Sequence, residues 1–269
     1  MTVVVAFLCS DGAVIAADSM LTPTLGQLNV GHHKAIKVHA LSGPQIVGWA
    51  GDQGQAARFT ALAEMHHQVA NQVPTTLEYP LGLTQGLIAQ FTATGIVNSI
   101  GVNAVLAFLH RGSCRCCVFE GPMQPRLLDA QHYYVVLGSG KLSADPFVRF
   151  ITDIFCRSGQ PNVREATFLA TWTIQHVIDT NPGGVAGPIR ITVFKKDLSG
   201  TYSVYEIPED ELEEHQQAIE SAADALRNWR SGVESGDAAK GVPPPPASPS
   251  QPAQPPAPAQ GKTPSGTSS

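Results

Sequence analysis

The second residue of the chain carries the functional groups of an N-terminal nucleophile. The sequence opens MTVVVAFLCSDGAVIAADS, and removal of Met1, which is usual before a small residue, would leave Thr2 with a free α-amine beside its own hydroxyl. Such an amine has a pKa of about 7.7–8.0, which suits general-base work near neutral pH. A threonine activated by its own amine is an established nucleophile arrangement. The alternative is that Thr2 is simply a common residue after Met1 and begins an ordinary strand.

A threonine nucleophile also needs a cation, a carboxylate to hold that cation, and hydrogen-bond donors for an oxyanion. The sequence offers each of them. Asp18 ends the strand-like run GAVIAADS, and Lys34 lies in GHHKAIKV at the start of another predicted strand. Gly51 lies in the glycine-rich turn GWAGDQGQA, whose backbone N–H groups could face developing negative charge. Ser139 lies in VVLGSGK, where a strand runs into a turn ahead of a helix.

The cysteines and histidines do not form a metal-binding pattern. In a strand, Cys114 and Cys116 share a face while Cys117 points away, and no second cysteine pair follows. The histidine pairs at 32–33 and 66–67 are adjacent, so their side chains point in different directions. We therefore predict buried cysteines, no metal and no cofactor.

Composition excludes several classes of protein. With 269 residues, the chain is long enough for a sizeable core. A net charge of -5 argues against a nucleic-acid partner, and no apolar run approaches the roughly 18 residues of a membrane span. No Lys or Arg precedes the first apolar run, and the five cysteines suggest no disulfide framework. We expect no signal peptide, no membrane contact and a cytoplasmic location.

The pattern of apolar residues predicts clusters of strands that alternate with clusters of helices. The predicted strands are 2–9, 12–18, 35–41, 44–51, 103–110, 114–120, 125–130, 132–140, 187–197 and 201–207; the predicted helices are 53–73, 84–100, 141–157, 162–179 and 209–229. This order favours an α+β domain, a four-layer αββα sandwich of two antiparallel sheets between helical layers. We assign it to residues 1–230. Residues 231–269 are rich in Pro, Ala and Ser and are predicted to be a disordered tail.

Taken together, these motifs resemble a proteasome β-type subunit, in particular the HslV-like branch of the N-terminal nucleophile (Ntn) hydrolases. The matching features are the threonine behind Met1, DGAVIAADS followed by Thr22, a lysine sixteen residues after the aspartate, WAG before the first helix and GSG before the third. They occur in order over roughly residues 2–190. Among bacterial variants, the betaproteobacterial proteasome homologue is the nearest group.

The resemblance implies a role for each matching residue. Thr2 would be the nucleophile, and Lys34, held by Asp18, would lower the proton affinity of the Thr2 hydroxyl. Ser139 would hydrogen-bond the α-amine and position a water molecule. The N–H of Gly51 would stabilise the oxyanion.

The resemblance also implies how a substrate would bind. Thr22 would pair its backbone with an extended substrate. The specificity pocket would be lined by Leu21, His32, Ile36 and Trp49. One region departs from the family pattern: Asp179 is retained, but it is followed by Thr180, Asn181 and Pro182, and the proline stands where the family usually has a serine. We interpret this as a marker of the branch and give Asp179 a supporting role.

The implied activity is hydrolysis of peptide bonds through an acyl-enzyme on Thr2, with no cofactor. The substrate would be a peptide or an unfolded protein, enclosed in a homo-oligomeric double ring of six or seven subunits per ring. The sequence leaves open whether an ATP-driven unfoldase feeds this ring. Two alternatives stay open. One is an Ntn amidase acting on a small amide, and the other is a catalytically silent ring scaffold that uses the tail for docking.

Overall fold

The computed structural model describes residues 2–22, 24–25, 28–29, 31–95, 100–181 and 184–234. The chain divides into two compact units, residues 1–221 and 222–269. The first unit contains both large sheets and the candidate site. The predicted disordered tail lies outside the described residues from position 235 onward, so the predicted domain boundary at residue 230 stays a prediction.

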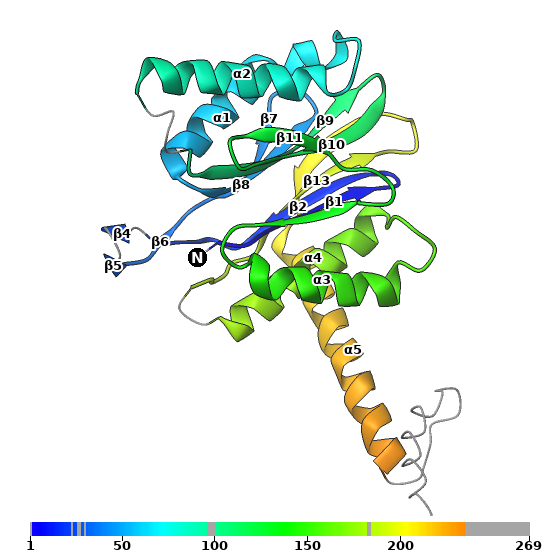
Figure 1. Cartoon of the computed structure of the whole chain (residues 1–269). Helices are drawn as coiled ribbons and strands as arrows, with labels where there is room; N and C mark the ends of the chain where they lie inside the picture. Colours follow the sequence, from blue (N-terminus) through cyan, green and yellow to red (C-terminus); the bar gives the residue numbers. More distant parts are fainter. Residues whose placement is uncertain are drawn as a thin grey trace, which may run out of the picture. The chain divides into compact units, whose positions relative to one another are not determined.

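Two five-stranded antiparallel sheets form the centre of the first unit (Figure 1). The first sheet has the order β12 (Tyr134–Leu137), β1 (Val4–Cys9), β2 (Gly12–Ala17), β13 (Arg190–Lys196) and β14 (Tyr202–Glu206). The second has the order β11 (Gln124–Leu127), β10 (Ser113–Glu120), β9 (Val102–His110), β8 (Gln45–Gly51) and β7 (Val38–Leu41). Two small ribbons pair β3 (Met20–Leu21) with β6 (His33–Lys34) and β4 (Thr24–Leu25) with β5 (Leu28–Asn29).

The β1–β2 hairpin lies inside the first sheet, between β12 and β13. Its register pairs Val4 with Ala17 and Cys9 with Gly12, and every residue of both strands is buried. Both faces of this sheet are covered, which explains why the two strands read as continuous apolar runs rather than alternating ones. At Gly12 a side chain has no room, because a Cβ atom there would lie 1.9 Å from the carbonyl oxygen of Phe194.

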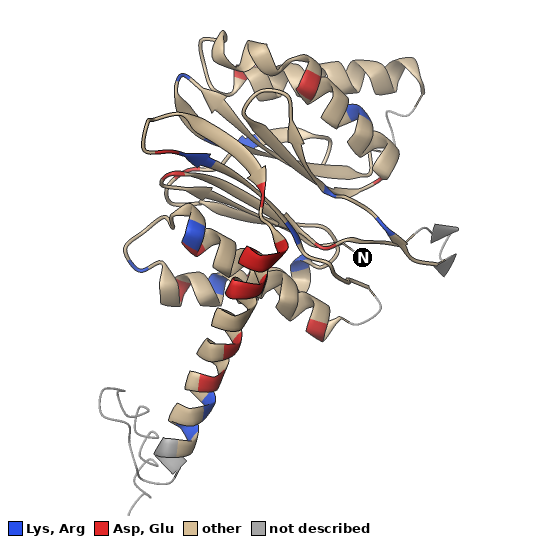
Figure 2. Cartoon of the chain, turned by 180° about the vertical axis from the view of Figure 1, so that it is seen from behind, with Lys and Arg blue, Asp and Glu red and all other residues tan. Residues whose placement is uncertain are grey.

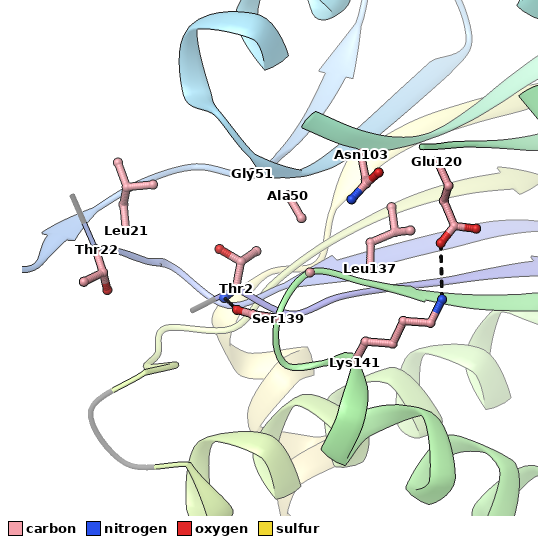
Figure 3. Close-up of a pocket in the computed structure, with 11 residues that line it drawn as sticks. Thr2, Leu21, Thr22, Ala50, Gly51, Asn103, Glu120, Leu137, Ser139 and Lys141 are labelled. Carbon is pink, nitrogen blue, oxygen red and sulfur yellow. Dashed lines mark hydrogen bonds and ion pairs between the residues drawn. The ribbon is translucent and has the colours of Figure 1, made fainter. Parts of the chain in front are cut away.

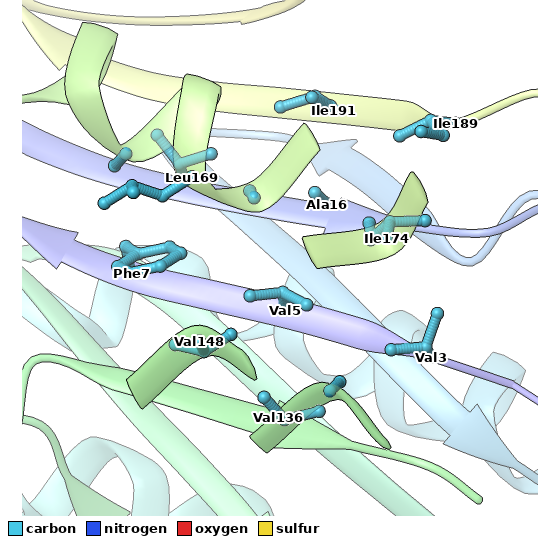
Figure 4. Packing of buried hydrophobic residues seen from close by; sticks show 14 of the residues in the cluster. Val3, Val5, Phe7, Ala16, Val136, Val148, Leu169, Ile174, Ile189 and Ile191 are labelled. Carbon is cyan, nitrogen blue, oxygen red and sulfur yellow. The ribbon is translucent and has the colours of Figure 1, made fainter. Parts of the chain in front are cut away.

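Helices cover the outer face of each sheet. On the second sheet lie α1 (Gln53–Met65), a 3₁₀ helix (His67–Asn71) and α2 (Glu78–Ala93); on the first lie α3 (Lys141–Phe155) and α4 (Val163–Thr180) (Figure 1). One apolar cluster fills the space between the sheets. A second joins the first sheet to α3 and α4 (Figure 4), and a third joins the second sheet to α1 and α2. The expected α+β, four-layer αββα architecture is confirmed.

Local sequence signals explain several helix ends. The Asn162 side chain and Glu165 form a reciprocal capping box at the start of α4. The last helix, α5 (Glu209–Glu234), has Glu209, Asp210 and Glu211 in its first turn, where acidic side chains complement the helix dipole (Figure 2). Among the described helices, none is both long and apolar enough to cross a membrane.

Three predicted helices differ from the structure by more than two residues at one end or both. The helix expected at 209–229 runs to Glu234, so residues 231–234 of the predicted tail are helical. The helix expected at 53–73 ends at Met65 and continues as the short 3₁₀ helix. The helix expected at 84–100 begins at Glu78, because Pro80 lies in the first turn, where a missing N–H costs nothing. It ends at Ala93, just before Gly95, whose positive φ of 73° terminates helices readily; residues 96–99 are outside the described residues.

Candidate active site

The fold holds Thr2 firmly at the start of β1. The Thr2 nitrogen donates a hydrogen bond to Ser139 Oγ at 3.1 Å, and the N–H of Gly140 donates to the Thr2 carbonyl oxygen at 2.9 Å. Gly138, with φ of 91°, lies so close that a Cβ atom would be 2.3 Å from that oxygen. The loop between β12 and α3 therefore fixes both sides of residue 2 (Figure 3).

Asp18, at the end of β2, links the start of β1 to a buried lysine. Its carboxylate accepts from the N–H of Val3 at 2.9 Å, from the N–H of Met20 at 3.0 Å and from Lys37 Nζ at 2.8 Å. The Val3 N–H and the Lys37 ammonium share one oxygen atom, Oδ1. The ammonium is thereby held next to the residue that follows Thr2.

The Asp18–Lys37 pair is completely buried, with both side chains 0% exposed. Lys37 Nζ also donates to the carbonyl oxygen of Met20. Burial lowers the pKa of Lys37, while the Asp18 carboxylate opposes part of this effect. The Lys37 carbonyl in turn accepts from the N–H of Trp49 at 3.0 Å, which ties this segment to β8. A buried ion pair of this kind is costly unless both ions are well bonded, as they are here.

The predicted pairing of Asp18 with Lys34 is wrong. Lys34 is exposed and lies on β6, where its backbone pairs with Met20. The predicted lysine lies sixteen residues after the aspartate, whereas the lysine that bonds Asp18 lies nineteen residues after it. The sequence did contain a signal for Lys37 as the partner of Asp18. Lys37 stands between Ile36 and Val38, and a lysine within an apolar run needs a partner for its charge if it is buried.

A cavity of about 330 Å³ opens at Thr2. Its walls come from both sheets, the loop before α3 and the segment after β2: Thr2, Leu21, Thr22, Ala50, Gly51, Asn103, Glu120, Leu137, Gly138, Ser139 and Lys141. Leu21 and Thr22 form one end, and Asn103, Glu120 and Lys141 form the other (Figure 3). Gly51 has a φ of 106°, and a Cβ atom there would lie 2.0 Å from the Gly101 carbonyl oxygen, so only glycine fits.

Three residues predicted for the specificity pocket do not line this cavity. His32 is exposed and its Nδ1 lies 3.3 Å from Thr22 Oγ1, and Ile36 is 48% exposed. Trp49 is buried in the cluster beneath α1 and α2, and its indole N–H donates to Nε2 of His39 at 3.4 Å. Neighbouring residues of a strand face opposite sides, so on β8 it is Ala50 that faces the cavity.

Asp179 also does not line this cavity. It is exposed near the end of α4 and accepts from the amide of Gln175 at 2.8 Å. Its supporting role at the site stays a prediction. The end of α4 contacts α3 through Asn181 instead, whose amide donates to Ser143 Oγ at 3.1 Å. Pro182 is outside the described residues.

Sequence reasoning missed the charged end of the cavity. Lys141 Nζ lies 3.2 Å from a carboxylate oxygen of Glu120, and Arg126 lies 3.6 Å from the other oxygen. Asn103 lies beside this group on β9 (Figure 3). These residues come from separate strands and a helix, so only the fold brings them together; the position of Lys141 directly after the GSG motif was the one available signal.

The described residues hold no metal-ligand cluster, and the Cys9, Cys116 and Cys117 thiols are buried. Within the described ranges, no group of three or more His, Cys, Asp or Glu side chains could hold a metal ion. Burial raises the pKa of the Cys9 and Cys116 thiols well above the usual value and that of Cys117 to about 12. Thiols of this kind are poor nucleophiles at neutral pH. Among the hydroxyl side chains that line the cavity, Thr2 is the one whose own backbone nitrogen is also bonded within the site, to Ser139.

The four-layer αββα sandwich, with a threonine at the start of an inner strand, is the Ntn-hydrolase type of fold. Three solved structures that align with this fold carry the name Anbu. The Gly-1 mutant of Anbu from Hyphomicrobium sp. strain MC1 aligns with a TM-score of 0.65 at 18% identity, over 86% of this chain and 97% of its own. Anbu from the same strain aligns with a TM-score of 0.63 at 16% identity, over 85% and 97%. Anbu (ancestral beta-subunit) from Yersinia bercovieri aligns with a TM-score of 0.61 at 16% identity, over 84% and 97%.

At these identities the likeness shows the fold alone. No protein-family model and no curated protein matches the sequence. The predicted resemblance to the HslV-like branch, and with it the betaproteobacterial group, is wrong, because the structural neighbours are Anbu proteins, a different proteasome-like branch. The short motifs that suggested it lie around Thr2, and such motifs do not distinguish one branch from another.

Proposed function

We propose that the protein is a threonine peptidase in which Thr2, exposed by removal of Met1, is the nucleophile. One observation carries the proposal: the Thr2 nitrogen is bonded to Ser139 while the buried Asp18–Lys37 pair is bonded to the next residue. A structural threonine at a chain start needs neither an ordered acceptor for its nitrogen nor a buried cation beside it. A nucleophile needs both.

Acylation follows from this geometry. The α-amine takes the proton of the Thr2 hydroxyl as the oxygen attacks the peptide carbonyl carbon, and the carbonyl electron pair moves to oxygen. The Lys37 ammonium favours the deprotonated hydroxyl through its positive charge, and the N–H of Gly51 is placed to stabilise the oxyanion. When the C–N bond breaks, the leaving amine takes the proton from the α-ammonium. The product is an ester on Thr2.

Hydrolysis of the ester uses the same groups in reverse. The α-amine takes a proton from a water molecule, whose oxygen attacks the ester carbon. The tetrahedral intermediate collapses, the C–O bond to Thr2 breaks, and the threonine oxygen recovers the proton. Ser139 keeps the amine in position throughout both halves of the cycle. No metal or cofactor takes part.

Substrate and assembly complete the proposal. Thr22 and Gly51 border the cavity and offer backbone groups to an extended peptide or an unfolded protein. A homo-oligomeric ring, fed by an unfoldase, would keep a cytoplasmic peptidase away from folded proteins. Support for self-association comes from α3, where Phe150 and Ile154, one helical turn apart, are both exposed apolar side chains. Such surfaces often mark protein contacts.

The proposal is tested by intact mass after incubation with a peptide epoxyketone, which reacts with both the hydroxyl and the free amine of one residue. We expect wild type to lack Met1 and to gain one inhibitor mass, whereas the Thr2→Ala variant gains none. Wild type that has lost Met1 but stays unlabelled would overturn the proposal in favour of the silent scaffold. A labelled protein with the native mass of a monomer would instead favour an amidase for small amides.

A further inference from the structure

The charged end of the cavity has no part in the proposed chemistry. Glu120 is the last residue of β10, Lys141 the first residue of α3, and Asn103 belongs to β9. All three line the same cavity as Thr2. The Glu120 and Lys141 side chains are 38% and 44% exposed, so a bound molecule can reach them.

This end of the cavity offers positive charge and hydrogen-bond donors. The Glu120 carboxylate lies between two cations, with Lys141 Nζ at 3.2 Å and Arg126 at 3.6 Å. One negative charge therefore faces two positive charges, of which Lys141 lines the cavity and Arg126 lies behind Glu120, outside the lining. An ammonium has three N–H donors and an asparagine amide has two, so Lys141 and Asn103 can both donate to an incoming carboxylate.

The mechanism assigns this end to the leaving group. The α-ammonium that protonates the leaving amine is held by Ser139, so the leaving amine must lie on the Ser139 side of Thr2. Lys141 follows two residues later, after Gly140, whose N–H is bonded to the Thr2 carbonyl. Leu21 and Thr22 lie on the opposite side of Thr2 (Figure 3).

We propose that Glu120, Lys141 and Asn103 form a subsite that selects an acidic side chain on the leaving-group side of the scissile bond. This proposal rests on the proposed peptidase function. Lys141 and Asn103 bind the substrate carboxylate, while Glu120 holds the Lys141 ammonium at the cavity wall. A basic substrate side chain meets the excess positive charge and is disfavoured.

The test uses internally quenched peptides that share one acyl side and carry Asp, Asn, Ala or Lys directly after the scissile bond. Cleavage positions are verified by mass. We expect wild type to cleave the Asp peptide with a kcat/KM about 3- to 10-fold above that of the Lys peptide, as fits one partly exposed charged contact. Added salt should reduce the ratio.

Two variants and a matched control locate the effect. Lys141→Ala should bring the Asp to Lys ratio within about twofold of unity, and Lys141→Glu should invert it. Arg115→Ala removes an exposed cation from the same strand as Glu120, away from the cavity lining, and should leave the ratio unchanged. A second series varies the residue before the scissile bond and should not respond to Lys141.

The outcomes separate this subsite from the peptidase proposal. If wild type forms no epoxyketone adduct, the peptidase proposal itself fails and the subsite fails with it. The subsite alone is overturned if the adduct forms but the Asp to Lys ratio is unchanged in both Lys141 variants. It is also overturned if the Lys141 variants change only the preference for the residue before the scissile bond.

Discussion

Replacing Lys37 with methionine should damage both the stability and the reactivity of the protein. The change removes a fully buried ammonium and leaves the Asp18 carboxylate inside the protein. Loss of one partner of a buried ion pair typically costs about 3–5 kcal/mol. Asp18 keeps hydrogen bonds from the N–H groups of Val3 and Met20, so we expect about 3 kcal/mol. For a domain of this size, that lowers Tm by roughly 6–12 °C.

The assay is thermal unfolding at matched protein concentration, together with the rate of epoxyketone labelling. Labelling by the Lys37→Met variant should slow by about 100-fold or more, because the positive charge beside the nucleophile is lost. Lys34→Ala is the matched control: this lysine is exposed, so the variant should stay within about 0.5 kcal/mol of wild type and label normally.

A double variant isolates the pair. Asp18→Asn combined with Lys37→Met leaves no buried charge and should cost about 2 kcal/mol less than the sum of the two single changes. Equal effects of the Lys34 and Lys37 substitutions, or full additivity in the double variant, would refute the argument that the Asp18–Lys37 pair supports the site.

Three further predictions concern the same region. The labelling rate should rise with pH through about 7.7–8.0, as the Thr2 amine becomes neutral. As the pH rises further, the labelling rate should fall, and this fall should begin before pH 10.5, because burial lowers the pKa of Lys37 and its positive charge is lost at a lower pH. A fall that begins only at or above pH 10.5 would contradict this. Ser139→Ala removes the acceptor of the Thr2 nitrogen and should slow labelling about tenfold, and an unchanged rate would exclude its positioning role. Gly51→Ala should lower Tm and abolish labelling, because a Cβ atom has no room there. Gly82→Ala, in open space on α2, should stabilise the protein by about 0.5–1 kcal/mol in thermal unfolding. A higher Tm for Gly51→Ala than for Gly82→Ala would contradict the geometry.

Sequence patterns predicted the layers well because burial leaves a strong periodic signal. Continuous apolar runs marked β1 and β2, and helical spacing marked α3 and α4 within a few residues. The short strands β3 to β6 were missed, since two-residue strands carry no periodicity.

The site residues that the sequence revealed are those with a local signal. Ser139 and Gly51 lie in glycine-containing turns at strand ends, GSG and GWAG, and both border the cavity with Thr2. The lysine was misassigned because its distance from Asp18 depends on how the chain between them folds. Glu120 and Lys141 meet across two elements, and no spacing rule predicts such a contact.

The way residue 2 is held has a practical consequence for anyone who prepares this protein. Its nitrogen lies in the wall of the cavity, bonded to the hydroxyl of Ser139, and its carbonyl is bonded to the loop before α3. Any tag or linker joined ahead of residue 2 must start from that wall and compete with whatever occupies the cavity. Affinity handles and fluorophores therefore belong at the other end of the polypeptide. In a sample with an uncleaved N-terminal tag, the residues ahead of Thr2 begin at the cavity wall, so activity and binding measurements describe a cavity that the tag obstructs.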